Sequence, residues 1–536
     1  MPQTIKIFDT TLRDGTQGEK VSFSAEDKFR IAQRLDEFGV DYIEGGWPGS
    51  NPKDMAFFEK AKTHAFRHAK IVAFGSTCRA GSVPAEDANI QALIAAETPA
   101  VSIFGKSWLL HVTEALKIFP EENLEIISGS VEYLKQNGKE VIYDAEHFFD
   151  GYKDNPEYAV STLKAAESAG ADVLVLCDTN GGTLTHEVSA IVSEVKKQVK
   201  APVGIHSHND GELAVANALA AVQAGAVHVQ GTINGYGERC GNANLCSVIP
   251  NLQLKLGYNC VPGNQIRHIA TLSKFVSELA NLVPDNKQPY VGRSAFAHKG
   301  GIHVSAVIKN EQTYEHVKPE LVGNSRRVLV SDLSGKSNVH YKSDELGLDL
   351  EKYSKESAEI VQKLKELENE GYQFEAAEAS FELLVKQMTE GAPDFFKLEG
   401  FRVIMERDGD GNSRSEATIR VRVNDQIEHS AAEGNGPVHA LDAAVRKALC
   451  EFYPEISAMH LQDYKVRVLN EKDGTGAKVR VLIDSAKDTA TWGTVGVSEN
   501  IIDASWQALS EGIIYFLMNQ NSKPKQKIEP KKVAVK

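Results

Sequence analysis

Short apolar runs and amphipathic segments alternate along the first half of the chain. From residue 4 to about residue 256 they recur at intervals of about 30 residues, the length of a βαβ unit. The amphipathic segments include AEDKFRIAQRLDEFG at 25–39 and PEYAVSTLKAAESAG at 156–170, which predict helices. The runs that predict strands are Ile5–Phe8, Tyr42–Gly45, Ile71–Gly75, Val101–Phe104, Val141–Asp144, Val173–Cys177, Val203–His206 and Val227–Gly231.

Eight strands, each followed by a helix, in about 250 residues predict a TIM barrel, (β/α)8, in the α/β class. A doubly wound open sheet would carry a G-x-G-x-x-G turn after its first strand. This chain has TTLRDGTQG at 10–18 instead. We therefore expect a catalytic barrel domain at residues 1–270.

The pattern changes twice beyond the barrel. Residues 271–394 are mainly helical and charged, with SAEIVQKLKELENEG at 357–371 as the clearest helix, and predict linker subdomains. Residues 395–520 contain a repeat: TIRVRVN at 418–424 resembles KVRVLID at 478–484, and ALDAAV at 440–445 resembles IIDASW at 501–506. Each copy predicts strands followed by a helix, and two such α+β copies must pack together or against a second subunit. The lysine-rich residues 521–536 predict a disordered tail.

Composition and charge exclude several classes of protein. The 536 residues are 42% hydrophobic, enough for more than one core, and carry a formal net charge of −14 spread along the chain. This acidic excess argues against nucleic acid as a partner, and no apolar stretch is long enough to span a membrane. The six cysteines form no C-x-x-C pair, so we expect reduced thiols in a cytoplasmic protein.

The sharpest chemical feature is GIHSHND at 204–210. His206 and His208 are two residues apart at the end of a predicted strand, so they project to the same side. A lone histidine in an apolar run is usually a core residue, but H-x-H at a barrel mouth favours a metal site. Asp210 is expected to cap the next helix.

A second feature is TTLRDGTQ at 10–17, which carries Arg13, Asp14 and Gln17 just after the first strand. Strands 1, 7 and 8 are close neighbours in a closed barrel, so Asp14 is expected to reach the two imidazoles. As a surface ion pair, Arg13 and Asp14 would contribute only about 0–1 kcal/mol. Their place at the barrel mouth favours a functional interpretation.

The glycine-rich loop NGYGERCGNAN at 234–244 follows the eighth strand. It is either a tight turn or part of the site, in which case Asn242 supplies an oxygen to the same cation. Two nitrogens with one or two oxygens leave open positions, as catalytic sites require, and suit Mn²⁺, Mg²⁺, Zn²⁺ or Co²⁺. Polar residues that follow other strands are expected on the same rim: Glu44, Lys106, Glu146, Asp178 and Thr179.

At these residues the chain resembles the DRE-TIM metallolyase superfamily, in the branch of isopropylmalate, homocitrate and citramalate synthases. The resemblance covers nearly the whole chain. Within the branch, WPGSNP at 47–52 and FAHKGGIHVSA at 296–306 look most like citramalate synthases. The four motifs that carry the family resemblance are LRDGTQ at 12–17, HSHND at 206–210, GERCGNA at 237–243 and GGIHVSA at 300–306.

The resemblance implies a Claisen-type condensation of acetyl-CoA with a 2-oxo acid, pyruvate in the citramalate branch, on a divalent metal held by Asp14, His206, His208 and Asn242. Its catalytic residues would be Arg13, Glu146, His303 and Tyr314, and its substrate-binding residues Arg13, Gln17 and Thr179. His303 would act as the base and Tyr314 would complete the site. Ser305 departs from family members that have a carboxylate two residues after this histidine.

The resemblance also implies a regulatory dimerisation domain at residues 395–520, hence a homodimer with an amino-acid effector, isoleucine for the citramalate reaction. Two other interpretations stay open. The substrate could be that of a 2-isopropylmalate or homocitrate synthase, or the protein could be a non-catalytic regulator that binds a metal and an amino acid.

Overall fold

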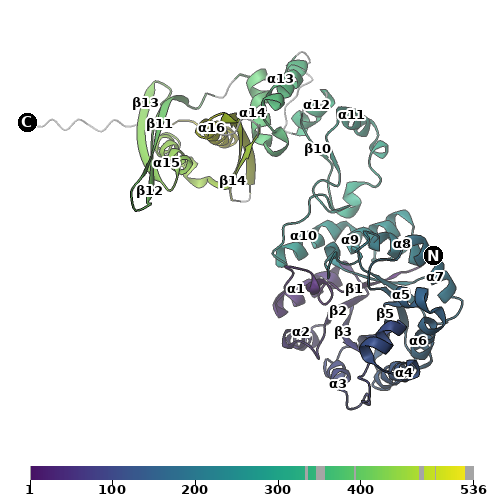
Figure 1. The fold of residues 1–536 in the computed structure, drawn as a ribbon. Helices are drawn as coiled ribbons and strands as arrows, with labels where there is room; N and C mark the ends of the chain where they lie inside the picture. The colour runs from purple at the N-terminus through teal and green to yellow at the C-terminus, as the bar shows by residue number, and fades with distance from the viewer. Residues whose placement is uncertain are drawn as a thin grey trace, which may run out of the picture. The chain divides into compact units, whose positions relative to one another are not determined.

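The computed structural model describes residues 2–331, 336–345, 356–391, 394–469, 476–488 and 490–524. They form two compact units: one comprises the residues up to 296 together with 315–326, and the other comprises 297–314 and the residues from 327 onward. Figure 1 shows the barrel from purple to teal and the C-terminal sheets from green to yellow. Most of the predicted disordered tail, from residue 525 onward, lies outside the described residues.

Eight parallel strands form a closed barrel in chain order, which confirms the predicted fold. Each strand pairs with its neighbours in sequence, and β1 pairs with β8 to close the ring. The predicted strands each overlap an observed one. The strands are β1 (Lys6–Asp9), β2 (Tyr42–Gly46), β3 (Lys70–Ser76), β4 (Ala100–Lys106), β5 (Glu140–Glu146), β6 (Val173–Asp178), β7 (Val203–Ser207) and β8 (His228–Gly231).

Helices follow the strands and cover the outside of the barrel. In the first of them, Ser24 and Asp27 form a reciprocal capping box, and Gly39 ends the helix with a φ of 92°. The predicted boundary at residue 270 falls inside the last of them. The helices are α1 (Ala25–Phe38), α2 (Pro52–Lys62), α3 (Ala88–Ala95), α4 (Pro120–Gln136), α5 (Phe148–Asp154), α6 (Pro156–Ser168), α7 (Thr185–Val195), α8 (Ala214–Gln223), α9 (Leu245–Pro250) and α10 (Ile269–Leu279).

The barrel interior changes from apolar to polar along the strands. A cluster of buried side chains that includes Phe8, Tyr42 and Val175 fills it, and the inward positions nearer the carboxyl ends hold Asp144 and His206. Because side chains alternate between the two faces of a strand, the apolar outward positions pack against the helices. The strand pattern thus collects polar groups at one end of the barrel.

One buried ion pair fixes the loop that follows β2. The Lys28 ammonium from α1 pairs with Asp54 of α2 and also donates to the Gly45 carbonyl oxygen at 3.0 Å. The other Asp54 oxygen accepts the Trp47 backbone N–H at 2.9 Å. Burial lowers the pKa of Lys28, although the Asp54 charge opposes this effect. The pair therefore joins two helices to the backbone that carries Trp47.

The second unit begins with a short parallel pair of strands and continues with helices, then with two antiparallel sheets, each of three strands. Each sheet is followed by a helix, as the repeat predicts. The elements are β9 (Ala297–His298), α11 (Gly301–Lys309), β10 (Arg327–Val328), α12 (Lys336–Glu345), α13 (Glu356–Glu370), α14 (Glu378–Thr389), β11 (Lys397–Arg407), β12 (Ser413–Val423), β13 (Gln426–Gly434), α15 (Pro437–Cys450), β14 (His460–Val468), β15 (Val479–Lys487), β16 (Ala490–Ser498) and α16 (Ile501–Asn519).

The two repeats pack together. TIRVRVN and KVRVLID occupy the central strands β12 and β15, and the two helical segments lie in α15 and α16. Ile419 of β12 and Leu441 of α15 share a core with Phe516 of α16, so the helix of the second copy completes the core of the first. The second sheet is also covered by the linker, since Phe381 of α14 packs with Val495 of β16.

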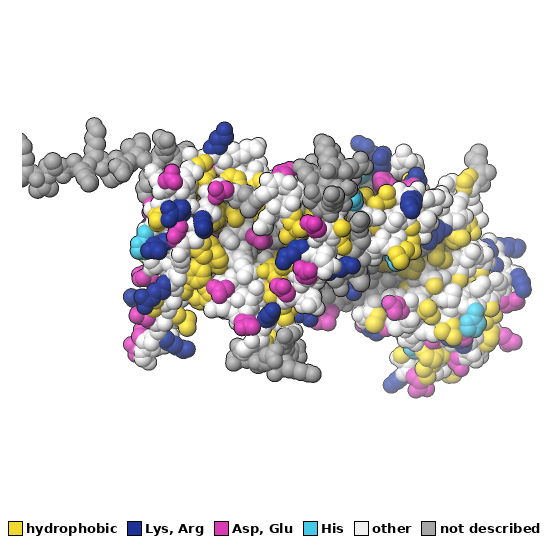
Figure 2. Space-filling view, turned by 90° about the horizontal axis from the view of Figure 1, so that it is seen from above, with side chains coloured by type: hydrophobic (Ala, Val, Ile, Leu, Met, Phe, Trp, Pro, Cys, Tyr) yellow, Lys and Arg dark blue, Asp and Glu magenta, His cyan; other side chains and the backbone are white. Residues whose placement is uncertain are grey.

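On the face seen in Figure 2, basic and acidic side chains are interspersed, in keeping with the dispersed charge of the sequence. Among the described residues, no helix combines the length and apolar character that crossing a bilayer requires.

The buried pair gives the first testable prediction. Replacing Lys28 by Met leaves the Asp54 carboxylate buried without its cation, which should lower the free energy of unfolding by about 3–5 kcal/mol. Calorimetric melting of the full chain would show this as a lower melting temperature of the barrel. Lys60→Met is the matched control, because its pair with Glu26 is about half exposed, and it should change stability by less than about 1 kcal/mol. Equal melting of the two variants would contradict the prediction.

Candidate metal centre and substrate pocket

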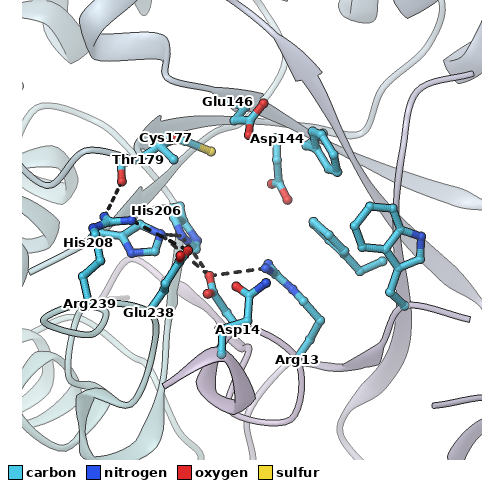
Figure 3. A pocket seen from close by; sticks show the side chains of 14 residues that line it. Arg13, Asp14, Asp144, Glu146, Cys177, Thr179, His206, His208, Glu238 and Arg239 are labelled. Atoms are coloured by element: carbon cyan, nitrogen blue, oxygen red, sulfur yellow. Dashed lines mark hydrogen bonds and ion pairs between the residues drawn. The ribbon is translucent and has the colours of Figure 1, made fainter. Parts of the chain in front are cut away.

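Three buried side chains meet at the carboxyl ends of β1 and β7 (Figure 3). His206 lies in β7 and His208 follows it, and their Nε2 atoms are 3.2 Å apart. The Asp14 Oδ2 atom is 3.3 Å from His206 Nε2 and 3.9 Å from His208 Nε2. One ligand atom from each residue lies within 4.8 Å of the others, so this group could hold a metal ion.

Unpaired polar atoms indicate that the group fits a cation. Within the part of the chain that the structure describes, the buried atoms Asp14 Oδ1, His208 Nδ1 and Asn242 Oδ1 neither accept nor donate a hydrogen bond. Leaving such atoms unpaired costs about 1–3 kcal/mol each, which a bound cation would offset at the oxygens. Asn242 forms a backbone bridge with His208 and donates its amide to the Tyr236 carbonyl oxygen at 3.2 Å. Its oxygen is therefore available beside the histidine.

The ionisation states suit the same purpose. Burial alone would raise the pKa of Asp14, but the Arg13 charge and the His206 hydrogen bond outweigh it and hold this pKa well below the ordinary value. Burial and the neighbouring His206 lower the pKa of His208 to about 3. A carboxylate and a neutral imidazole are the forms that bind metals. Burial would lower the pKa of His206, but the Asp14 hydrogen bond and charge outweigh it and raise the value, so a cation would bind His206 in place of its Nε2 proton.

Arg13 is fixed beside this group by three contacts. Its Nε donates to Glu44 Oε2 at 2.6 Å, its Nη1 lies 3.4 Å from Asp14 Oδ2, and its guanidinium carbon lies 3.7 Å from the centre of the Phe74 ring. Burial would lower the pKa of Arg13, but the Glu44 and Asp14 charges outweigh it and raise the value. Arg13 thus presents a permanent positive charge to the pocket.

A pocket of about 210 Å³ opens above these residues. The pocket lining includes three further residues that the sequence analysis predicted: Gln17, Glu146 and Thr179. The Thr179 hydroxyl oxygen accepts the His147 N–H at 2.9 Å, and Glu146 forms an ion pair with Lys106. The remaining lining residues are Arg13, Asp14, Trp47, Phe74, Phe104, Asp144, Cys177, His206, His208, Glu238 and Arg239.

Aromatic side chains that the sequence analysis missed form one wall of the pocket. Phe74 and Phe104 are stacked with their ring centres 5.5 Å apart, and Trp47 meets both edge to face at 5.5 and 5.8 Å. The Trp47 indole N–H donates to Asn89 Oδ1 at 2.7 Å. Counting alternate positions along β3 and β4 would have identified the two phenylalanines as inward residues.

The prediction that Asp210 caps the next helix is wrong. It does not cap α8, because the Ala214 N–H at the start of this helix bonds to Asn209 Oδ1 at 3.2 Å. Instead, both Asp210 oxygens bind Arg239, at 2.7 and 2.8 Å, and Arg239 also donates to the Thr179 carbonyl oxygen. Arg239 therefore links the loops that follow β6, β7 and β8 by hydrogen bonds.

His303 and Tyr314 belong to the second unit. Their rings are stacked with centres 4.1 Å apart, His303 in α11 and Tyr314 after it. His303 is exposed and Tyr314 is 44% exposed. The two predicted residues are therefore neighbours of each other on an accessible surface.

Comparison with known proteins gives three family matches along the chain. The model described as HMGL-like matches residues 4–276, the homocitrate synthase post-HMGL domain-like model matches 290–372, and the LeuA allosteric (dimerisation) domain matches 375–517.

Curated relatives match over nearly the full length. The chain is 59% identical to the (R)-citramalate synthase of Geobacter sulfurreducens, covering 96% of this chain and 97% of that protein. It is 58% identical to the (R)-citramalate synthase of Aquifex aeolicus, covering 97% and 98%. It is 33% identical to a probable 2-isopropylmalate synthase of Methanopyrus kandleri, covering 96% and 98%.

The triad of Asp14, His206 and His208 predicts where a metal binds. Asp14→Ala removes a charged oxygen and should weaken Mn²⁺ binding by more than about 100-fold, since even the loss of a residue behind a ligand costs about 10–100-fold. Equilibrium dialysis with metal analysis measures the effect, and circular dichroism checks the fold. Asp154→Ala removes an exposed carboxylate that accepts the Trp108 indole N–H, outside the metal centre, and should leave Mn²⁺ binding unchanged. Normal Mn²⁺ binding by Asp14→Ala would refute the assignment.

Proposed function

This chain belongs to the (R)-citramalate synthase family, and from that premise we propose that it condenses acetyl-CoA with pyruvate and hydrolyses the thioester to give (R)-citramalate and CoA. The observation that carries this proposal in the structure is the buried group of Asp14, His206 and His208 beside the fixed charge of Arg13. A 2-oxo acid has a carbonyl and a carboxylate oxygen that suit such a site.

The proposed cofactor is a divalent metal, Mn²⁺, Mg²⁺, Zn²⁺ or Co²⁺, held by Asp14, His206, His208 and Asn242. When bound, it would supply Lewis acidity toward the carbonyl group of the 2-oxo acid. The chain itself supplies the remaining electrostatics. Arg13 stabilises the negative charge that develops on the carbonyl oxygen, and it needs no reorganisation because Glu44 already orients it.

Pocket residues bind the rest of the substrate. The Thr179 hydroxyl accepts a bond from the His147 N–H, so its own proton is left to donate to the substrate carboxylate. Gln17 lines the same pocket and supplies a further polar contact. The wall of Trp47, Phe74 and Phe104 gives the pocket an apolar surface against which the methyl group of pyruvate would pack.

Carbon–carbon bond formation requires a base for the acetyl-CoA methyl group. We assign this role to His303, with Glu146 assisting: the methyl proton passes to the imidazole, and the resulting carbon attacks the carbonyl carbon of pyruvate. Water then cleaves the thioester and CoA leaves as a thiol. Tyr314 stacks on His303 and would hold its ring in place.

The C-terminal match supports regulation and assembly. A LeuA allosteric (dimerisation) domain at 375–517 favours a homodimer with an amino-acid effector, and isoleucine is the effector we propose. The alternative substrates, those of 2-isopropylmalate and homocitrate synthases, would need a pocket that accepts larger groups than a methyl. The M. kandleri protein, a probable 2-isopropylmalate synthase, is a more distant relative at 33% identity.

Release of free thiol from acetyl-CoA tests the function directly. With a panel of 2-oxo acids we expect pyruvate to give the highest kcat/KM, and chelation with EDTA to abolish release until Mn²⁺ is restored. A preference for 2-oxoisovalerate or 2-oxoglutarate would replace the proposal with one of the alternative synthases. No release with any acid would favour a non-catalytic, metal-binding and amino-acid-binding regulator.

His303→Ala tests the proposed base. Loss of a general base typically lowers the rate by about 10²–10⁴-fold, and Mn²⁺ content should stay unchanged because His303 lies outside the triad. His268→Ala, which removes another exposed imidazole, should have normal kinetics. The assignment would be wrong if the two variants had the same kcat.

Isoleucine inhibition tests the proposed effector on the whole chain. Deleting the C-terminal domain would expose Phe381 of α14 by removing Val495, so truncation confuses regulation with folding. We expect isoleucine, and not leucine at the same concentration, to inhibit CoA release. Calorimetric titration should give the same isoleucine affinity for Asp14→Ala as for the unmodified chain. Competition between isoleucine and pyruvate for one site would contradict a separate regulatory site.

A further inference from the structure

A chain of hydrogen bonds crosses the barrel interior beneath the candidate metal centre. Ser102 Oγ donates to Asp144 Oδ2 at 2.5 Å, and Gln230 Nε2 donates to Asp144 Oδ1 at 2.9 Å. Gln230 Oε1 lies 2.8 Å from His206 Nδ1. All four side chains are buried. Because β6 and β7 separate β5 from β8 in the barrel, the bond from Gln230 to Asp144 spans the interior.

The chemistry of these groups determines which atom donates and which accepts at each hydrogen bond. A carboxylate only accepts hydrogen bonds, so the Gln230 amide must turn its NH₂ group toward Asp144. Its oxygen then faces His206, and an oxygen can only accept. The Nδ1 atom of His206 must therefore carry a proton, so Nε2 is the ring nitrogen that a cation can bind in place of a proton.

His206 Nε2 is the atom that meets the other members of the triad, at 3.2 Å from His208 Nε2 and 3.3 Å from Asp14 Oδ2. A metal binds the unprotonated ring nitrogen. We infer that Gln230 is a positioning residue that holds His206 in the tautomer a divalent cation requires, and that Asp144 and Ser102 orient Gln230. This inference rests on the metal site of the proposed function.

The two histidines differ in this respect. Within the described residues His208 Nδ1 is buried without a hydrogen-bond partner, whereas His206 Nδ1 has one at 2.8 Å. His206 is thus the ligand whose orientation is set before any cation arrives.

The neutral amide also separates the Asp144 charge from His206. A carboxylate bonded directly to the ring would increase its basicity and reduce the Lewis acidity of the cation. An amide sets the tautomer of His206 without reducing the Lewis acidity of the cation. The relay of Ser102, Asp144 and Gln230 therefore orients the ligand while preserving the positive character of the site.

Mn²⁺ binding, followed by the electron paramagnetic resonance of the free ion, tests the inference without measuring activity. Gln230→Met keeps the shape of the side chain and removes both hydrogen bonds, so it should weaken Mn²⁺ binding by about 10–100-fold. Gln288→Met is the matched control. Gln288 is also buried and donates to Asn234, outside the relay, so this variant should bind Mn²⁺ normally. Equal affinity of the two variants would overturn the inference.

A charge swap covers the possibility that Gln230→Met folds poorly. In Gln230→Glu with Asp144→Asn, Glu accepts from His206 Nδ1 and from the new Asn amide, and the Asn oxygen accepts from Ser102. The double variant keeps every hydrogen bond and the total charge. It should regain at least about tenfold of the Mn²⁺ affinity lost in Gln230→Met. A folded double variant that binds Mn²⁺ about 10–100-fold more weakly than the unmodified chain would count against the relay.

The tautomer itself separates failure of the relay from failure of the metal site. In ¹⁵N-histidine-labelled, metal-free protein at alkaline pH, the ring nitrogens of His206 should show Nδ1 protonated, and Gln230→Met should shift this signature toward a mixture. A signature that does not change would overturn the relay even if Mn²⁺ binds. Absence of Mn²⁺ binding in the unmodified chain, with the tautomer as expected, would refute the proposed metal function alone.

Discussion

Hydrogen bonding between β1 and β8 is the constraint on which the site depends. It closes the barrel and brings the residues after β1 beside those of β7, so Asp14 meets histidines nearly two hundred positions away in the chain. The register matters as much as the closure, because Gln230 of β8 is level with Phe8 on one side and His206 on the other. A slip of one residue would turn the inward side chains outward and separate the relay from its histidine.

Electrostatics at the barrel mouth complement this geometry. Asp14, Glu44 and Asp144 are buried around the guanidinium of Arg13, which contacts the first two directly. Buried carboxylates are expensive unless a cation balances them. Burial and the Glu44 charge raise the pKa of Asp144 to about 6, as expected for acids buried close to one another. A divalent cation would add positive charge beside these acids and occupy the oxygens that the protein leaves unpaired.

The two copies of the C-terminal repeat have different packing partners. Phe516 of α16 helps to form the core of the first copy, so the first copy is not complete alone. The second copy also packs against α14, and Tyr372 before that helix bonds to Gln507 of α16 at 3.0 Å. The linker is therefore part of the folded core of the second repeat. A rearrangement of that repeat would displace α14, which offers a physical route by which an effector could act on the linker.

Local patterns in the sequence determined most of the architecture. Short apolar runs predicted all eight barrel strands, and the repeat predicted the two C-terminal sheets with their helices. The H-x-H spacing with the Arg13 and Asp14 pair predicted the metal-binding group. Each of these patterns depends on neighbours a few residues apart. The aromatic wall, the Asp210 to Arg239 pair and the relay through Gln230 and Asp144 appeared only in the tertiary structure. Their partners come from different strands and loops, and side-chain contacts between elements depend on barrel closure, register and inward direction, which no local pattern records.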